Sequence, residues 1–187
     1  TVSPAEGYKV DYVKVNGERI RAVDGAYKFI LSGTTSVEVA FMDANTLRSS
    51  AYVICADKYS NVSGPFPSSI SSLLKSGEDI VTSVSGSVNY KSGDALKFGS
   101  GSKPNTTFVI NLSQKVTSII IRATAWKDST STLTIDGSVE SSVTTSQGTG
   151  DSSGYADYTF TFAEGVDTIT VSAAGRYLIS GLTFLYA

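Results

Sequence analysis

The sequence predicts an all-β fold in which a small, repeat-like β unit precedes an antiparallel β sandwich of jelly-roll character. Apolar and polar residues alternate with a period of two over most of the stretch from Ala95 to Gly137, as in half-buried strands. Turn-forming pairs, among them Asn16-Gly17 and Asp136-Gly137, separate the alternating stretches. Long segments with the 3.6-residue period of a helix are scarce, so strands dominate the prediction.

The first unit is expected over residues 1–44. Asn16-Gly17 follows an alternating stretch that ends at Val15. It is the pair preferred in a two-residue type I′ hairpin, because both central residues there need a positive φ. The alternation resumes over residues 27–29 and 37–41. The sequence therefore predicts four short strands in a very small unit.

The order of these elements resembles the divergent form of the internalin-type B-repeat. The matching segments are Gly7-Tyr8-Lys9-Val10, Val13-Lys14-Val15-Asn16-Gly17, Tyr27-Lys28-Phe29 and Val37-Glu38-Val39-Ala40-Phe41. The resemblance covers residues 5–41 and implies a spacer or adhesion module of a surface protein, not an enzyme.

Residues 45–70 are expected to form a linker or a segment shared between the units. Within it, Ala51–Ala56 reads as a buried strand of either unit, and residues 61–67 are rich in turn formers. One short helix is predicted over Ser68–Lys75, because serines that can cap it precede apolar residues at helical spacing and Gly77 follows as a stop signal.

The second unit is expected over residues 71–187. Alternating stretches recur over residues 156–162, 169–171 and 178–184, and Ala174-Gly175 marks a tight turn. Short strands at this spacing predict a sandwich or jelly roll. The segment 99–103 has the letters of a phosphate loop without its spacing or its following helix, so we interpret it as a hairpin loop.

This second unit resembles a C-terminal accessory module of secreted bacterial proteins. The matching segments are Gly93–Ser100, Ile119–Asp128, Leu133–Gly137 and, near the end of the chain, Arg176–Phe184. Such modules have a jelly-roll character similar to carbohydrate-binding modules and are appended to hydrolases, nucleases and surface proteins. The resemblance implies a β sandwich that binds a polysaccharide, and its motifs do not specify the ligand.

Composition and charge limit the classes of partner that we expect this chain to bind. The net charge is −2 without a basic block, which gives no electrostatic support to a nucleic-acid surface. No apolar run approaches the length of a membrane span. Charged residues are only 17% of the chain, and serine and threonine take their place, as suits an extracellular β protein. We expect a piece of a larger bacterial protein that is secreted or displayed on the cell surface.

The sequence gives little support for a catalytic site or for a bound cofactor. The chain has no histidine, which removes the commonest general base and most zinc sites. Asp128, Asp136, Asp151 and Asp157 are candidate glycosidase carboxylates, but each lies beside turn residues, where aspartate serves the backbone. The chain has no closely spaced set of carboxylates of the kind that binds calcium. We therefore predict no cofactor, and a structural calcium ion is the weaker alternative. Cys55 is alone and reads as a small buried hydrophobe.

The candidate ligand site centres on the one tryptophan. If the alternation holds, Trp126 shares an outward face with Arg122, where an indole and a guanidinium suit a sugar ring. A bulge at Thr124–Ala125 would instead rotate Trp126 into the core, where tryptophan is usually found. The predicted ligand contacts are Trp126, Arg122, Tyr155, Arg176 and Tyr177, the last three from loops at the rim.

Three hypotheses about function follow. A non-catalytic module that binds a polysaccharide or cell-surface glycan comes first, and another domain of the same parent chain is a possible further partner. A structural or adhesive spacer that contacts proteins or the cell surface is the alternative. An accessory to a nuclease is the third, and the acidic balance argues against it. An outward cluster that includes Trp126 would favour sugar binding, whereas buried aromatics would favour the spacer.

Overall fold

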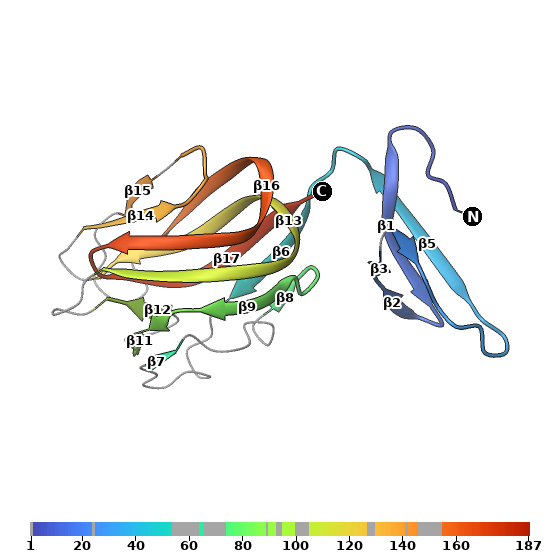
Figure 1. Cartoon of the computed structure of the whole chain (residues 1–187), viewed down its shortest axis with the longest axis horizontal. Coiled ribbons are helices and arrows are strands. Elements are labelled where there is room, and N and C mark those ends of the chain that lie inside the picture. The colour runs from blue at the N-terminus through green and yellow to red at the C-terminus, as the bar shows by residue number, and fades with distance from the viewer. Residues whose placement is uncertain are drawn as a thin grey trace. The chain divides into compact units, whose positions relative to one another are not determined.

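The computed structural model describes residues 2–23, 25–53, 64–65, 74–88, 90–92, 95–99, 105–126, 130–140, 142–145 and 155–187. Two compact units divide the chain, one over residues 1–47 and one over residues 48–186. We call them the N-terminal unit and the sandwich unit (Figure 1). In the described residues every regular element is a strand and every strand pair is antiparallel, so the predicted fold class is confirmed.

The N-terminal unit contains a three-stranded sheet in the order β2–β1–β5 and a separate pair, β3–β4. The bounds are β1 (Tyr8–Val15), β2 (Glu18–Ile20), β3 (Ala22–Val23), β4 (Ala26–Tyr27) and β5 (Val37–Asp43). Asn16 has φ 52° and Gly17 has φ 87° between β1 and β2. This pair of positive angles is the requirement of the type I′ turn that the sequence predicts.

The two faces of the N-terminal sheet differ in character. On one face the Lys14 ammonium and the Arg19 guanidinium lie 4.6 and 5.0 Å from the centre of the Tyr12 ring. The Tyr12 hydroxyl donates to Glu38, which also pairs with Lys14 at 3.6 Å. The other face is apolar and centres on Val13, the one large apolar side chain buried among the described residues of this unit.

The strands of the sandwich unit are more numerous and two of them are long. Their bounds are β6 (Arg48–Val53), β7 (Gly64–Pro65), β8 (Leu74–Ser76), β9 (Val81–Ser85), β10 (Ser87–Val88), β11 (Tyr90–Ser92), β12 (Ala95–Phe98), β13 (Thr106–Ala125), β14 (Ser131–Ile135), β15 (Ser142–Thr145), β16 (Ala156–Ala174) and β17 (Tyr177–Tyr186).

A ribbon of β13 and β16 connects the two layers of the sandwich. The first half of β13 pairs with β9 and the second half pairs with β17, while β16 accompanies it throughout. The register shifts between Asn111 and Ser118, where the two strands curve round together (Figure 1). One layer therefore contains β9, β14 and β15, and the other contains β6, β12 and β17.

The core lies between these layers. Phe98 of β12 stacks on Phe108 from the first half of β13 and on Tyr177 of β17, with ring centres 5.0 Å apart in both pairs. Tyr52 of β6 and Ile80 also belong to the core, and its other side chains are mostly alternate residues of β13, β14, β16 and β17. This is the arrangement that period-two alternation predicts for two facing sheets.

In the segment between the predicted units, the structure corrects one prediction and decides between the alternatives of another. Leu74 and Lys75, the end of the predicted helix Ser68–Lys75, lie in strand β8 against β6. Residues 68–73 lie outside the described residues. β6 pairs with β17 along residues 48–53, so it belongs to the sandwich unit. Cys55 lies outside the described residues.

Tyr52 of β6 forms hydrogen bonds with the segment that follows β8. Its ring is fully buried and meets Phe184 edge-on at 5.7 Å. Its hydroxyl accepts hydrogen bonds from the backbone N–H groups of Ile80 at 2.8 Å and Val81 at 3.1 Å and donates to Asp79 at 2.9 Å. Burial is the main cause of a raised Tyr52 pKa. The hydroxyl therefore stays neutral and satisfies the two backbone N–H groups.

Candidate functional site

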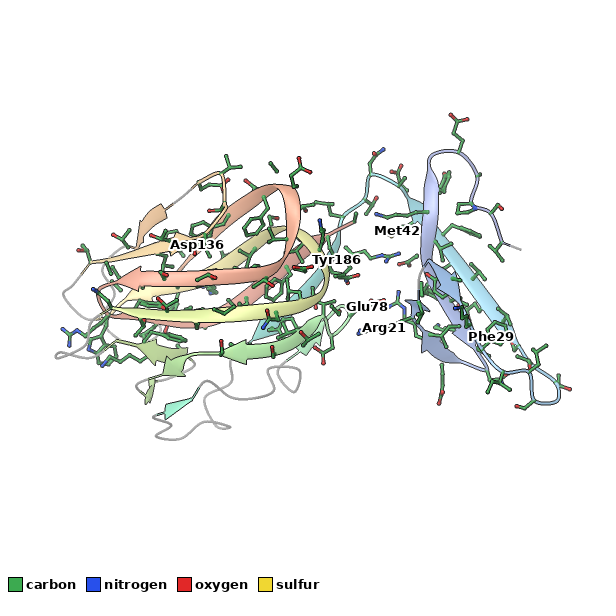
Figure 2. The ribbon with its side chains drawn as sticks, in the orientation of Figure 1. Arg21, Phe29, Met42, Glu78, Asp136 and Tyr186 are labelled. Carbon is green, nitrogen blue, oxygen red and sulfur yellow. The ribbon has the colours of Figure 1, made fainter. Side chains whose placement is uncertain are left out.

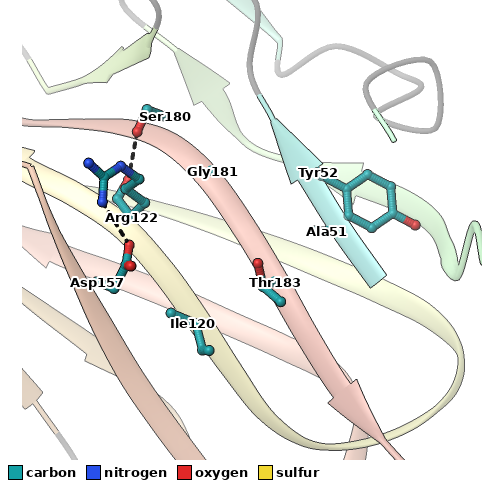
Figure 3. A pocket seen from close by; sticks show the side chains of 8 residues that line it. All are labelled: Ala51, Tyr52, Ile120, Arg122, Asp157, Ser180, Gly181 and Thr183. Carbon is teal, nitrogen blue, oxygen red and sulfur yellow. Dashed lines mark hydrogen bonds and ion pairs between the residues drawn. The ribbon is translucent and has the colours of Figure 1, made fainter. Parts of the chain in front are cut away.

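A shallow groove of about 250 Å³ lies on the outer face of the layer that contains β6 and β17 (Figure 3). Its lining comes from four strands that are distant in sequence: Ala51, Tyr52, Ile120, Arg122, Asp157, Ser180, Gly181 and Thr183. We call it the Arg122 groove. Ligand pockets that enclose a small molecule usually measure about 300–1,000 Å³, so this groove suits contact with one side of a longer ligand.

Arg122 and Asp157 form the charged centre of the groove. The strand register places them directly opposite each other in β13 and β16. The Arg122 Nη1 lies 3.2 Å from the Asp157 Oδ1, and 52% and 59% of the two side chains remain exposed. Such exposed pairs contribute little to stability. A guanidinium has five N–H donors and a carboxylate has several lone pairs, so both groups keep capacity for a ligand.

Gly181 makes the room beside this pair. On the side away from Asp157, Arg122 lies opposite Gly181 of β17, and the register between β13 and β17 shifts at Ser180. A Cβ atom at Gly181 would meet the Tyr52 carbonyl oxygen at 3.5 Å and the Arg122 Cβ at 3.7 Å, which is ordinary contact. A side chain could therefore be accommodated by the fold, and its absence is what leaves the groove open.

Trp126 lies on the same outer face but is covered. Leu178 stands between Tyr177 and Ile179 of the main core, so its side chain points outward. Trp126 packs with Leu178 and Ala95 in a small second cluster and is only 8% exposed. The alternation therefore predicts the correct side of the sheet, but the indole is buried like a core residue and offers no platform.

Lys97 completes this second cluster. Its ammonium lies 4.5 Å from the centre of the Trp126 indole, and the residue is only 6% exposed. A cation over an indole is a favourable contact, most of all when it is desolvated. No sequence pattern singles out Lys97, because only the pairing of β12 with β17 brings it beside the end of β13.

The structure brings Tyr155 and Arg176 beside Trp126, but neither is exposed as the predicted ligand surface requires. Tyr155 is half-buried against the Trp126 cluster. Arg176 is half-buried at the turn before β17, and its carbonyl accepts a hydrogen bond from the backbone N–H of Trp126 at 2.9 Å. Tyr177 was expected at the rim, but it is fully buried, and burial raises its pKa above the ordinary value. Of the five predicted contacts, Arg122 alone is exposed.

A second hollow of about 430 Å³ lies on the layer that contains β14. Its lining is rich in hydroxyl groups: Asn105, Thr106, Thr107, Thr134, Asp136, Ser172, Ala173 and Ala174. Thr107 and Ser172 share a hydrogen bond of 3.2 Å. Farther along, Asn111 binds Ser83 and Thr168 at 2.9 and 3.2 Å. Thr107 and Ser172 thus bind each other, and Asp136 is the only charged residue of the lining. The Arg122 groove, which presents an exposed cation and an exposed carboxylate side by side, is the better candidate site.

The two described aspartates among the predicted carboxylates lie in different hollows. Asp136 lies in the second hollow and Asp157 in the Arg122 groove, while Asp128 and Asp151 lie outside the described residues. In the described part of the chain, no three His, Cys, Asp or Glu side chains gather as a metal site would require. No helix among the described residues has the length and apolar character to cross a membrane.

Comparison with known proteins does not identify the chain. No known family matches the sequence, and no curated protein is similar to it.

Proposed function

We propose that the sandwich unit is a non-catalytic binding module of a larger secreted or cell-surface protein and that it contacts a polysaccharide along the Arg122 groove. The observation that carries this proposal is the exposed pair of Arg122 and Asp157 beside the open space at Gly181. The buried tryptophan changes the mechanism expected from the sequence, because binding then relies on hydrogen bonds instead of aromatic stacking.

The chemistry of the pair suits neighbouring hydroxyl groups. Arg122 offers donors only and Asp157 offers acceptors only, and a sugar hydroxyl can serve as either partner. Ile120 is half-buried and Gly181 has no side chain, so both can lie against the C–H face of a sugar ring. The groove has a modest volume and stays partly open to solvent. We therefore expect weak binding to an internal segment of a polymer.

A glycan array probed with the intact chain, followed by titration of the best ligand, tests this proposal. Arg122→Ala removes the donors, and Gly181→Val fills the space without removing a polar group; each should weaken binding at least 10-fold. Lys115→Ala is the matched control, because Lys115 is an exposed cation of the same strand outside the groove. Equal binding by all four proteins would refute the groove as the site.

A structural or adhesive spacer is the second candidate, and two observations favour it. Trp126 and Tyr177 are buried, which is the arrangement expected of a spacer. The exposed apolar side chains gather in the N-terminal unit, not in the Arg122 groove. If the intact chain binds no glycan at millimolar concentration, the spacer is the better description.

A further inference from the structure

The N-terminal unit exposes an unusual amount of apolar surface. Among the described residues, every exposed large apolar side chain except Val139 belongs to this unit: Val2, Tyr8, Val23, Phe29, Ile30, Leu31, Val37, Phe41 and Leu47 (Phe29 is labelled in Figure 2). Scattered exposed apolar residues need no explanation, but their concentration in a unit with one buried valine does. Such surfaces usually mark an interaction site.

Strand β5 combines this apolar surface with an open edge. Figure 1 shows β5 at the edge of its sheet, and in the described part of the chain it pairs with β1 alone. The strand has no lysine or proline, and its only charged residues are Glu38 and Asp43. Natural proteins usually protect such edges with lysine, proline or a bulge. The unprotected edge therefore suits the addition of another strand.

The hydrogen bonds of the sheet show which residues face this edge. Asn16 N–H donates to the Ser36 carbonyl at 2.8 Å, and Ala44 N–H donates to the Gly7 carbonyl at 2.8 Å. Even-numbered residues of β5 thus direct their backbone groups toward β1, because the direction alternates along a strand. The N–H and C=O groups of Val37, Val39 and Phe41 point to the open edge.

The same three residues are apolar and lie on one face. Val39 is opposite Val13, and Val37 is opposite Val15, so they belong to the apolar face of the sheet. The side chains of Val37 and Phe41 are 46% and 45% exposed. A strand that pairs with this edge would therefore extend the apolar face as well as satisfy the backbone.

We propose that two copies of the chain associate by antiparallel pairing of their β5 strands about a twofold axis at Val39. This register places Val37 opposite the partner's Phe41 and Val39 opposite its own counterpart. Each hydrogen-bonded pair exchanges two backbone bonds, so about six form across the axis. Cross-strand pairs of aromatic and β-branched residues are favourable.

Charge and sequence favour a second copy over an unrelated strand. Glu38 is the only charge within residues 37–41, and it is already bound by Tyr12 and Lys14 on the other face. In this register it lies opposite Ala40 of the second copy, so no like charges meet. The paired surface is smaller than the interface of about 1,600 Å² found in stable complexes. We expect a weak dimer with a Kd of about 10 μM to 1 mM.

Sedimentation velocity of the intact chain over a wide concentration range measures this association. Phe41→Lys should weaken the dimer at least 10-fold, because it removes the aromatic contact and places a charge opposite Val37. Ile30→Lys is the matched control: Ile30 is 90% exposed in the same unit but lies outside β5, so its dimer should be unchanged. A chain that is monomeric at 1 mM, or equal effects of both variants, would overturn the proposal.

A double variant tests the register itself. Val37→Glu alone should also weaken the dimer, whereas Val37→Glu combined with Phe41→Lys places each new lysine opposite a new glutamate of the other copy. Association should recover at least 5-fold over either single variant at low salt and weaken again as salt screens the pairs. No recovery would exclude the register centred on Val39. Circular dichroism confirms that each variant keeps its strand content.

Discussion

Trp126→Ala distinguishes a buried indole from a ligand platform. The indole packs against Ala95, Leu178 and Tyr155 and is 8% exposed. A buried tryptophan removes about 150–250 Å² from water, which corresponds to about 4–6 kcal/mol at 25 cal/mol per Å². Because such areas are upper estimates, we expect the truncation to lower the free energy of unfolding by about 3–5 kcal/mol, the range of comparable core truncations.

Differential scanning calorimetry of the intact chain provides the assay. For a unit of this size a loss of about 3–5 kcal/mol lowers the Tm by roughly 10–20 °C. Trp126→Phe is the control, because it keeps an apolar ring in the cluster and should cost less than half as much. Lys97→Met keeps the aliphatic stem but removes the cation over the indole and should cost about 0.5–2 kcal/mol. A Tm within about 2 °C of wild type for Trp126→Ala would refute the buried cluster.

Two further predictions concern single polar groups of the sandwich unit. Tyr52→Phe should lower the free energy of unfolding by about 1–3 kcal/mol in urea titrations, because two backbone N–H groups lose their acceptor; an unchanged midpoint would contradict this. Glu140 accepts the Thr161 N–H at 2.6 Å and the Thr161 hydroxyl, and these bonds lower its pKa. Its stabilisation is therefore complete above the ordinary carboxyl pKa near 4.5 and is lost as the pH falls through the lowered value. Glu140→Gln should flatten the Tm profile below about pH 4.5, and an identical profile would show that these bonds do not contribute.

Local patterns predicted much of the secondary structure. The Asn16-Gly17 turn depends on the φ angles of two adjacent residues, so the pair itself carries the information. Residues 156–162 alternate between the core and the outer face as the sequence predicts, because burial of one face selects a period of two. The all-β class follows from many such stretches together.

The same local rules misread the chain where burial competes with spacing. Leu74 has helical spacing from the apolar residues before it, yet Leu74 and Ser76 pair with β6, since the backbone there gains partners from an existing sheet edge. Tyr177 follows a turn and resembles a loop residue, but it stacks on Phe98 inside the core. Both outcomes depend on strands that are distant in sequence.

The candidate site shows most clearly what the sequence determines by itself and what only the tertiary structure determines. The sequence alone determined that Arg122 lies in a strand with its side chain on the outer face, because alternation depends only on neighbouring residues. The tertiary structure decided that Asp157 stands beside it, that Gly181 leaves space, and that Trp126 is covered. Those relations depend on the register between strands and on which segments pack over a face. They are set by the packing of the whole unit and not by any one stretch of the chain.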